Sequence, residues 1–208
     1  MKQVRTSVFV ALAVSALALF PSHGVWAQDV APQAAGVVRI KTVTQLGRDM
    51  LQRASGFGGR SAKAKSWGVF DVDFDTAPEW IDELTITYTV MLHNEKAAQG
   101  EKPISFFQVT SVYTDIARGR DHKAGAVLVP AALERFGRPI GFAAQMFVEG
   151  SLVGEFGVGD GILSAQEKWW QNPVITASPN VQKREGYLLE RSKSPFSLVD
   201  VDSYEASR

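Results

Sequence analysis

Alternating apolar and polar residues dominate the chain from residue 67 onward. Phe70, Val72 and Phe74 alternate with aspartates, and a longer alternation covers residues 84–92. A period of two is typical of strands that bury one face. We therefore predict two strands here. The inner face of the second strand is predicted to hold Leu84, Ile86, Tyr88, Val90 and Leu92, with Thr85, Thr87, Thr89 and Met91 on the opposite face.

Further strands and a few short helical turns are predicted along the rest of the chain. The strands are expected at 37–43, 104–116, 124–129, 140–149, 152–158, 187–191 and 196–201. Helical turns are expected at 76–79, at 130–136, and from 164–167 to a close at Asn172 and Pro173, where capping residues or a proline begin each segment. None is long enough to connect parallel strands, which need a crossover of a dozen or more residues. The sequence therefore predicts an all-β fold, a two-sheet antiparallel β-sandwich of Ig-like type.

The first 27 residues predict an export signal rather than a part of the fold. Lys2 and Arg5 precede an apolar run at 7–20, and Val25 and Ala27 occupy the positions that signal peptidase reads. The run has 14 residues, fewer than the roughly 20 that span a bilayer. The expected organisation is a signal peptide at 1–27, a flexible leader at 28–36 and a single β-sandwich domain at 37–208.

Composition and charge narrow the classes of function. The chain has 22 basic and 22 acidic residues, and loss of Lys2 and Arg5 with the signal leaves 20 and 22, a net charge of −2. This balance disfavours nucleic acid as a partner. Cysteine is absent, which excludes disulfides, a thiol nucleophile and a cysteine-bound metal. We expect an exported protein of the periplasm or cell surface, with no membrane span once the signal is removed.

Two patterns resemble ligand sites. Asp71, Asp73 and Asp75 alternate on one strand face, and oxygen clusters of this kind bind hard cations. Their spacing of about 7 Å is too wide for one ion unless the strand bends. The segment GEFGVGDG at 154–161 resembles a phosphate-binding loop but lacks the Gly-Lys-Ser/Thr sequence. A solvated strand face and a glycine-rich loop are the favoured interpretations, so no metal and no cofactor are expected.

Tryptophans offer an alternative function. Trp169 and Trp170 are adjacent, and with Trp67 and Trp80 they are candidates for stacking on sugar rings. Packing in the core is the simpler explanation for such residues.

Catalysis has no signature in this sequence. His93 and His122 lie in segments predicted to be polar loops, and no G-x-S-x-G sequence is present. Carboxylates are numerous, but no pair stands out as the acid and base of a glycoside hydrolase. We therefore name no catalytic residue and expect no enzyme, with an unrecognised hydrolase as a third alternative.

The segment SWGVFDVDFDTAPEWIDELTITYTVML, residues 66–92, is the most distinctive part of the chain. It resembles a family of exported pilus-like proteins from Verrucomicrobia, through Trp67, the alternating apolar and acidic residues, and PEWIDEL at 78–84 leading into a long strand. The pattern extends to about Tyr204. The resemblance implies an Ig-type sandwich, association with type IV pilus-like machinery and no established catalytic residues. Unlike a type IV pilin, the chain has no glutamate after its basic start, so a soluble accessory is expected.

Together these observations predict a non-enzymatic, exported Ig-like protein that makes protein–protein contacts in or on the cell envelope. Its expected partners are other envelope or pilus-like proteins, or a second copy of itself. The terminal strands predicted at 37–43 and 196–201 are the expected edges for such contacts, because an edge strand can accept another strand. The alternative is a secreted glycan-binding module that uses exposed tryptophans.

Overall fold

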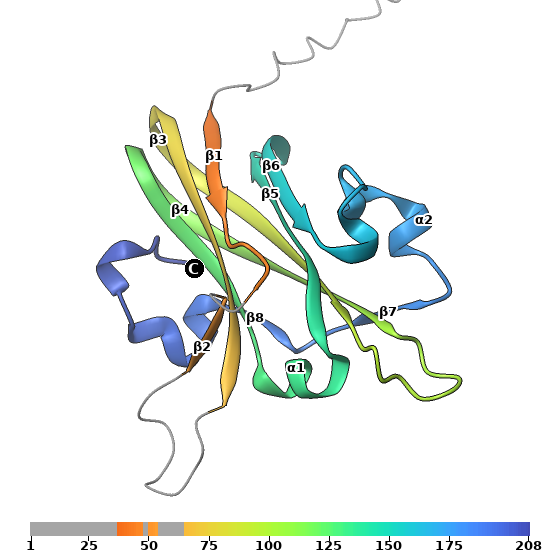
Figure 1. Ribbon diagram of the computed structural model, residues 1–208. Coiled ribbons are helices and arrows are strands. Elements are labelled where there is room, and N and C mark those ends of the chain that lie inside the picture. Colours follow the sequence, from red (N-terminus) through yellow and green to blue (C-terminus); the bar gives the residue numbers. More distant parts are fainter. Residues whose placement is uncertain (1–36, 48–49, 54–64) are drawn as a thin grey trace, which may run out of the picture. The chain divides into compact units, whose positions relative to one another are not determined.

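The computed structural model describes residues 37–47, 50–53 and 65–208. The predicted signal peptide at 1–27 and leader at 28–36 lie outside these residues. The strands are β1 (Val38–Val43), β2 (Leu51–Arg53), β3 (Ser66–His93), β4 (Ile104–Leu128), β5 (Arg138–Val148), β6 (Ser151–Gly159), β7 (Val181–Arg184) and β8 (Leu188–Glu190). They form one hydrogen-bonded sheet in the order β6-β5-β3-β4-β7, with β1 and β2 on β3 and β8 on β4 (Figure 1). The all-β prediction is confirmed, but the hydrogen bonds do not divide the strands into two sheets.

Two long antiparallel strands form the centre of the sheet. β3 has 28 residues and β4 has 25, and they pair from Gly68 opposite Leu128 to His93 opposite Ile104. Each of them unites two of the shorter predicted strands. The helical turn predicted at 76–79 is wrong, because these residues lie inside β3.

The capping residues of that predicted turn serve a corner instead. We call residues 76–83 of β3 and 114–121 of β4 the corner, where the paired strands bend (Figure 1). The register shifts twice between Phe74 and Trp80, and Asp115 has a φ of 57°. Irregular pairing of this kind lets two strands change direction together.

The hydroxyl of Thr76 connects the two strands at the corner. It donates a hydrogen bond to the carbonyl of Ala117 at 2.8 Å and accepts one from the N–H of Gly119 at 2.9 Å. Arg118 Nε donates to the carbonyl of Ala77 at 2.7 Å. The sequence predicts a helix cap at Thr76 because a threonine hydroxyl satisfies free backbone groups in the same way at a helix N-terminus and at this corner.

The bend brings the two halves of the hairpin together around one core. Phe70, in the first half of β3, has its ring centre 5.0 Å from that of Phe142 on β5, which pairs with the second half. Tyr88 and Tyr113 share a buried hydrogen bond of 2.9 Å between their hydroxyls. The predicted inner face is confirmed, since Leu84, Ile86, Tyr88, Val90 and Leu92 are all fully buried.

The opposite face of β3 is only partly exposed. Thr85 and Thr87 are partly exposed as predicted, but Thr89 and Met91 are buried. Residues 161–181 cover that end of the sheet, where Met91 packs in a second apolar cluster with Trp169. Period-two alternation marks which residues share a face, but it does not reveal that a later segment covers the outer face.

The remaining pairs are short and mostly antiparallel. β5 and β6 form the predicted hairpin, and its turn has positive φ at Glu149 and Gly150, as a two-residue hairpin turn requires. β7 pairs with β4 in parallel, against the antiparallel prediction. This parallel pairing does not require a single crossover helix, because the chain returns to β4 only after β5, β6 and a series of helical turns.

Of the two helical pieces predicted outside the corner, one is confirmed. α1 (Pro130–Phe136) has the predicted bounds, with Pro130 in its first turn and Gly137 after its end. The helical piece predicted to begin with the capping box at 164–167 and to close at Asn172 and Pro173 does not begin there: Ser164 follows the end of η1 (Gly161–Leu163), where its N–H donates to the carbonyl of Gly161. η2 (Trp169–Gln171) and α2 (Pro173–Thr176) follow.

The strand predicted at 196–201 is also wrong. This region consists of η3 (Arg191–Lys193), η4 (Pro195–Leu198) and η5 (Val201–Ser203). Pro195 has no N–H to donate to the hydrogen-bond ladder of a sheet. The hydroxyl of Ser194 caps η4 by accepting a hydrogen bond from the N–H of Phe196. The chain then returns to β4, where the Glu205 N–H donates to the carbonyl of Lys123. We call residues 191–208 the C-terminal strap.

Candidate binding groove

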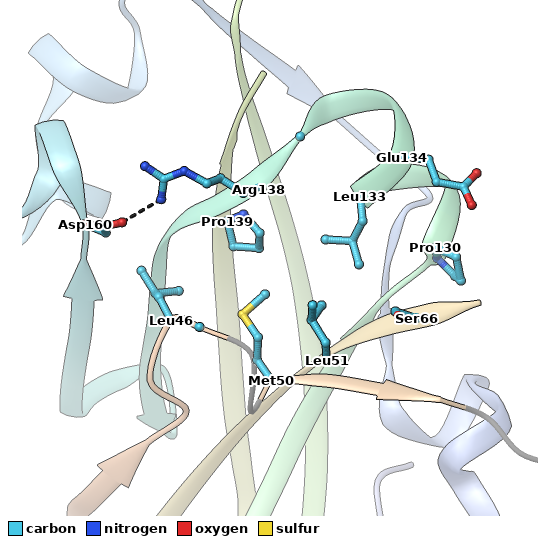
Figure 2. Close-up of a pocket in the computed structure, with 12 residues that line it drawn as sticks. Leu46, Met50, Leu51, Ser66, Pro130, Leu133, Glu134, Arg138, Pro139 and Asp160 are labelled. Carbon is cyan, nitrogen blue, oxygen red and sulfur yellow. Dashed lines mark hydrogen bonds and ion pairs between the residues drawn. The ribbon is translucent and has the colours of Figure 1, made fainter. Parts of the chain in front are cut away.

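A groove of about 660 Å³ opens between α1, β2 and the first residues of β5 (Figure 2). Its lining comes from segments that are far apart in the sequence but converge on one end of the β3–β4 hairpin. The lining residues are Leu46, Gly47, Met50, Leu51, Ser66, Pro130, Leu133, Glu134, Gly137, Arg138, Pro139 and Asp160.

Gly137 sets the position of one wall. It follows α1 with a φ of 85°, a conformation that glycine adopts at little cost. A Cβ at this position would lie 2.1 Å from the carbonyl oxygen of His93, so a larger residue would force the turn away from β3. The close turn places Arg138 and Pro139 at the start of β5, beside the groove.

The interior of the groove is apolar. Figure 2 shows Leu46, Met50, Leu51, Leu133 and Pro139 directed toward the same space. Met50 is 3% exposed and belongs to the main core, whereas Leu51 is 42% exposed. The groove therefore joins the core to the surface and leaves apolar side chains in contact with water.

The charges at the rim are already paired. Arg138 lies 2.6 Å from Asp160 and 3.3 Å from Glu95, measured from guanidinium nitrogen to carboxylate oxygen. Lys65 lies 3.0 Å from Glu134 in the same way. The hydrogen bond from Arg138 lowers the pKa of Asp160 below its usual value. The arrangement suits an apolar ligand better than a reaction that needs a free acid or base.

The three aspartates predicted to share a strand face do so, but each has its own partner. Asp73 accepts a hydrogen bond from the Thr42 hydroxyl at 2.7 Å. Asp75 accepts the N–H of Asp121 at 3.0 Å and lies 3.9 Å from Lys41. Within residues 37–47, 50–53 and 65–208, no group of three or more His, Asp or Glu side chains could hold a metal ion.

Asp71 occupies a polar cluster that the sequence did not predict. Its Oδ2 accepts the Tyr204 hydroxyl at 2.9 Å and lies 3.7 Å from Lys123. The guanidinium of Arg191 lies over the Tyr204 ring, 3.6 Å from the ring centre. Burial raises the pKa of Asp71 and also that of Tyr204. Asp71 and Tyr204 are 133 positions apart in the sequence, and no local spacing signals such a contact.

The glycine-rich segment at 154–161 is not a loop. Gly154, Gly157 and Gly159 lie in β6, and Gly161 begins η1. A Cβ at Gly157 would lie 2.3 Å from the ring of Trp170, and one at Gly159 would lie 2.7 Å from Leu163. These glycines give room to neighbouring side chains rather than to a phosphate.

The tryptophans fall into two groups. Trp169 is 1% exposed, and its ring meets that of Trp170 edge to face at 5.8 Å. Trp67 packs against Phe196 of the C-terminal strap at 6.0 Å. Trp80 at the corner is 60% exposed. A glycan site built on Trp169 and Trp170 is therefore not supported, because Trp169 is enclosed by the protein.

The two histidines among the described residues both lie in strands. His93 ends β3. His122 lies within β4, not in a loop as predicted, with Nδ1 2.6 Å from Glu205 and its ring stacked on Phe74. Nε2 of His122 lies 3.1 Å from the hydroxyl of Thr76, so both ring nitrogens already have protein partners.

Comparison with known proteins places the chain in a family. A protein-family model matches residues 34–208. The chain belongs to this family. A similar solved structure is the crystal structure of a protein from Akkermansia muciniphila, with a TM-score of 0.63 and 19% identity over 82% of this chain and 93% of that one. At this identity the likeness concerns the fold.

The comparisons agree in part with the resemblance of residues 66–92. Akkermansia is a member of the Verrucomicrobia, the group of the pilus-like family described above. Neither comparison refers to a pilus. A search of curated proteins finds no match to the chain. In the part of the chain that the structure describes, no helix combines the length and apolar character needed to cross a membrane.

Proposed function

We propose that the mature protein is exported and acts without catalysis, by contacting other proteins in or on the cell envelope as an accessory of type IV pilus-like machinery. The observation that carries this proposal is the groove, where apolar side chains face water and the charges of the rim are paired. Covering apolar surface is the main source of free energy in protein association. The occupant would be an apolar segment of a partner protein.

Two further observations support the cellular setting. The first 27 residues have the order of a secretory signal. The segment at 66–92 resembles exported pilus-like proteins of Verrucomicrobia, and a member of that group supplies a structure of the same fold. The pilus-like role rests on this resemblance.

Glycan binding remains a second candidate because of one residue. Trp80 is 60% exposed and offers a ring face on which a sugar can stack. The other described tryptophans are enclosed or packed, so this candidate now depends on Trp80.

Affinity capture from envelope extracts tests the proposal. The mature protein should retain pilus-like assembly proteins, identified by mass spectrometry, and Leu51→Glu should lose them because it places a charge in the apolar groove. Leu152→Glu is the matched control, since Leu152 on β6 is 44% exposed and Leu51 is 42% exposed. Equal capture by both variants would contradict the proposal. So would a mature protein that captures no protein but binds a defined glycan tightly.

A further inference from the structure

The corner carries a large exposed aromatic side chain on a fixed piece of backbone. Trp80 lies on β3 opposite Ala117 of β4 and is 60% exposed. Among the described residues its ring pairs with no other aromatic ring and lies under no cation. Tryptophan is enriched among the residues that dominate the affinity of protein interfaces.

One edge of β3 lacks a strand partner at this corner. β1 pairs with β3 as far as Thr76, and β5 pairs with the same edge from Leu84 onward. Residues 78–83 therefore have β4 on one side and no described strand on the other. Pro78 has no N–H to donate, but the residues after it can pair with an added segment of extended backbone.

The charge around Trp80 is acidic and unpaired. Four exposed acids at the corner form no ion pair within the described residues, and two exposed arginines lie on β4 nearby, which leaves a local charge of −2. Asp121 is left out of this count because its charge is paired with Lys41. The acids are Glu79, Asp82, Glu83 and Asp115, and the arginines are Arg118 and Arg120.

We propose that the corner binds an extended basic segment of a partner protein. A lysine or arginine of that segment lies over the Trp80 ring, where a cation is attracted by the aromatic face. Another basic side chain of the segment faces Asp82, which shares a face of β3 with Trp80. The backbone of the segment pairs with the open edge of β3. This inference rests on the proposed function, because it adds a second contact surface and the chemistry of its partner.

A synthetic peptide tests the proposal with the mature protein. The probe is a peptide of about ten residues that alternates Lys and Thr, so that its lysines share one face when it is extended. The comparison peptide carries Glu in place of each Lys. Fluorescence anisotropy of the labelled peptides should show saturable binding of the Lys peptide alone, and added salt should weaken it.

Variants assign the binding to the corner. Trp80→Ala should weaken the Lys peptide about tenfold or more, as expected for a central interface residue. The combined variant Glu79→Gln, Asp82→Asn and Glu83→Gln should weaken it in the same way. Ile162→Ala is the matched control, because Ile162 is 62% exposed and lies away from the corner on η1. Thermal melts establish that each variant is folded.

Three results would overturn the inference: equal affinity for both peptides, unchanged affinity in Trp80→Ala, or no saturable binding of the Lys peptide. Stacking of a soluble glycan on Trp80, with no peptide bound, would assign the corner to sugars instead. If the Lys peptide does not bind but Leu51→Glu still loses the captured proteins, the inference about the corner fails and the proposed function stands. Normal capture by Leu51→Glu with intact peptide binding would overturn the groove-based proposal alone.

Discussion

Asp71 owes its environment to the C-terminal strap, because Tyr204 of the strap donates a hydrogen bond of 2.9 Å to its Oδ2. Its side chain is 18% exposed, and its Oδ1 has no hydrogen-bond partner in the part of the chain that the structure describes. Burial penalises the charged form of the carboxyl, which raises the pKa of Asp71. The hydrogen bond from Tyr204 and the charge of Lys123 act in the opposite direction.

The raised pKa of Asp71 predicts how one substitution changes with pH. The folded protein keeps the proton at a pH where the unfolded chain, with its ordinary pKa of 3.8, has lost it. The contribution of Asp71 is therefore present below 3.8 and is lost as pH rises through the raised pKa. Asp71→Asn cannot lose a proton. Its free energy of unfolding, measured against wild type, should therefore rise between about pH 3 and pH 7.

Urea melts of both proteins across this range provide the measurement. Asp202→Asn is the control, because Asp202 is exposed on the same strap. A difference between Asp71→Asn and wild type that stays constant with pH, or that falls toward neutrality, would show that burial does not dominate the carboxyl.

The core face of β3 predicts unequal effects at neighbouring positions. Ile86 is fully buried, so Ile86→Ala should cost about 2–5 kcal/mol of stability through lost burial and the cavity it leaves. Thr87 is partly exposed and shares a hydrogen bond with Thr110 at 3.1 Å. Thr87→Ala should cost about 0.5 kcal/mol. Denaturant melts decide this, and similar losses at both positions would mean that the assignment of faces is wrong.

At the scale of elements, the corner is the bend that brings the two halves of the β3–β4 hairpin together around one core. Thr76 is 6% exposed and satisfies backbone groups of Ala117 and Gly119 across the bend. Thr76→Val keeps the shape of the side chain and removes these bonds. It should cost about 1–3 kcal/mol, because buried polar groups lose their partner. Thr87→Val is the control on the straight part of β3, and equal stability of the two variants would refute the role given to the hydroxyl.

The sequence predicted those elements whose signals are local. The alternation at 84–92 identified the core face, and Pro130 with Gly137 gave the bounds of α1. It misread 76–79 because Thr76 caps backbone groups on another strand, 41 residues away. It misread 196–201 because Pro195 and Ser194 favour a short helix over the apolar alternation. The groove and the Asp71 cluster join distant segments, so no sequence spacing could reveal them.

At the scale of the whole molecule, the first prediction concerns where the mature chain begins. Small residues at Val25 and Ala27 favour cleavage after Ala27. The exported protein should therefore start at Gln28 and appear in the soluble envelope fraction. N-terminal sequencing of that fraction is the measurement. A chain that keeps Met1 and sediments with membranes would contradict the prediction.

The central claim is that the groove contacts another envelope protein, and site-specific cross-linking in intact cells tests it most directly. The chain has no cysteine, so Leu51→Cys introduces a single thiol in the groove, and Leu152→Cys places one at a position of similar exposure on β6. A thiol-reactive photo-cross-linker attached at each position should join residue 51, but not residue 152, to one defined protein of the pilus-like machinery. Cross-links that are equal at the two positions, or absent from both, would contradict the claim.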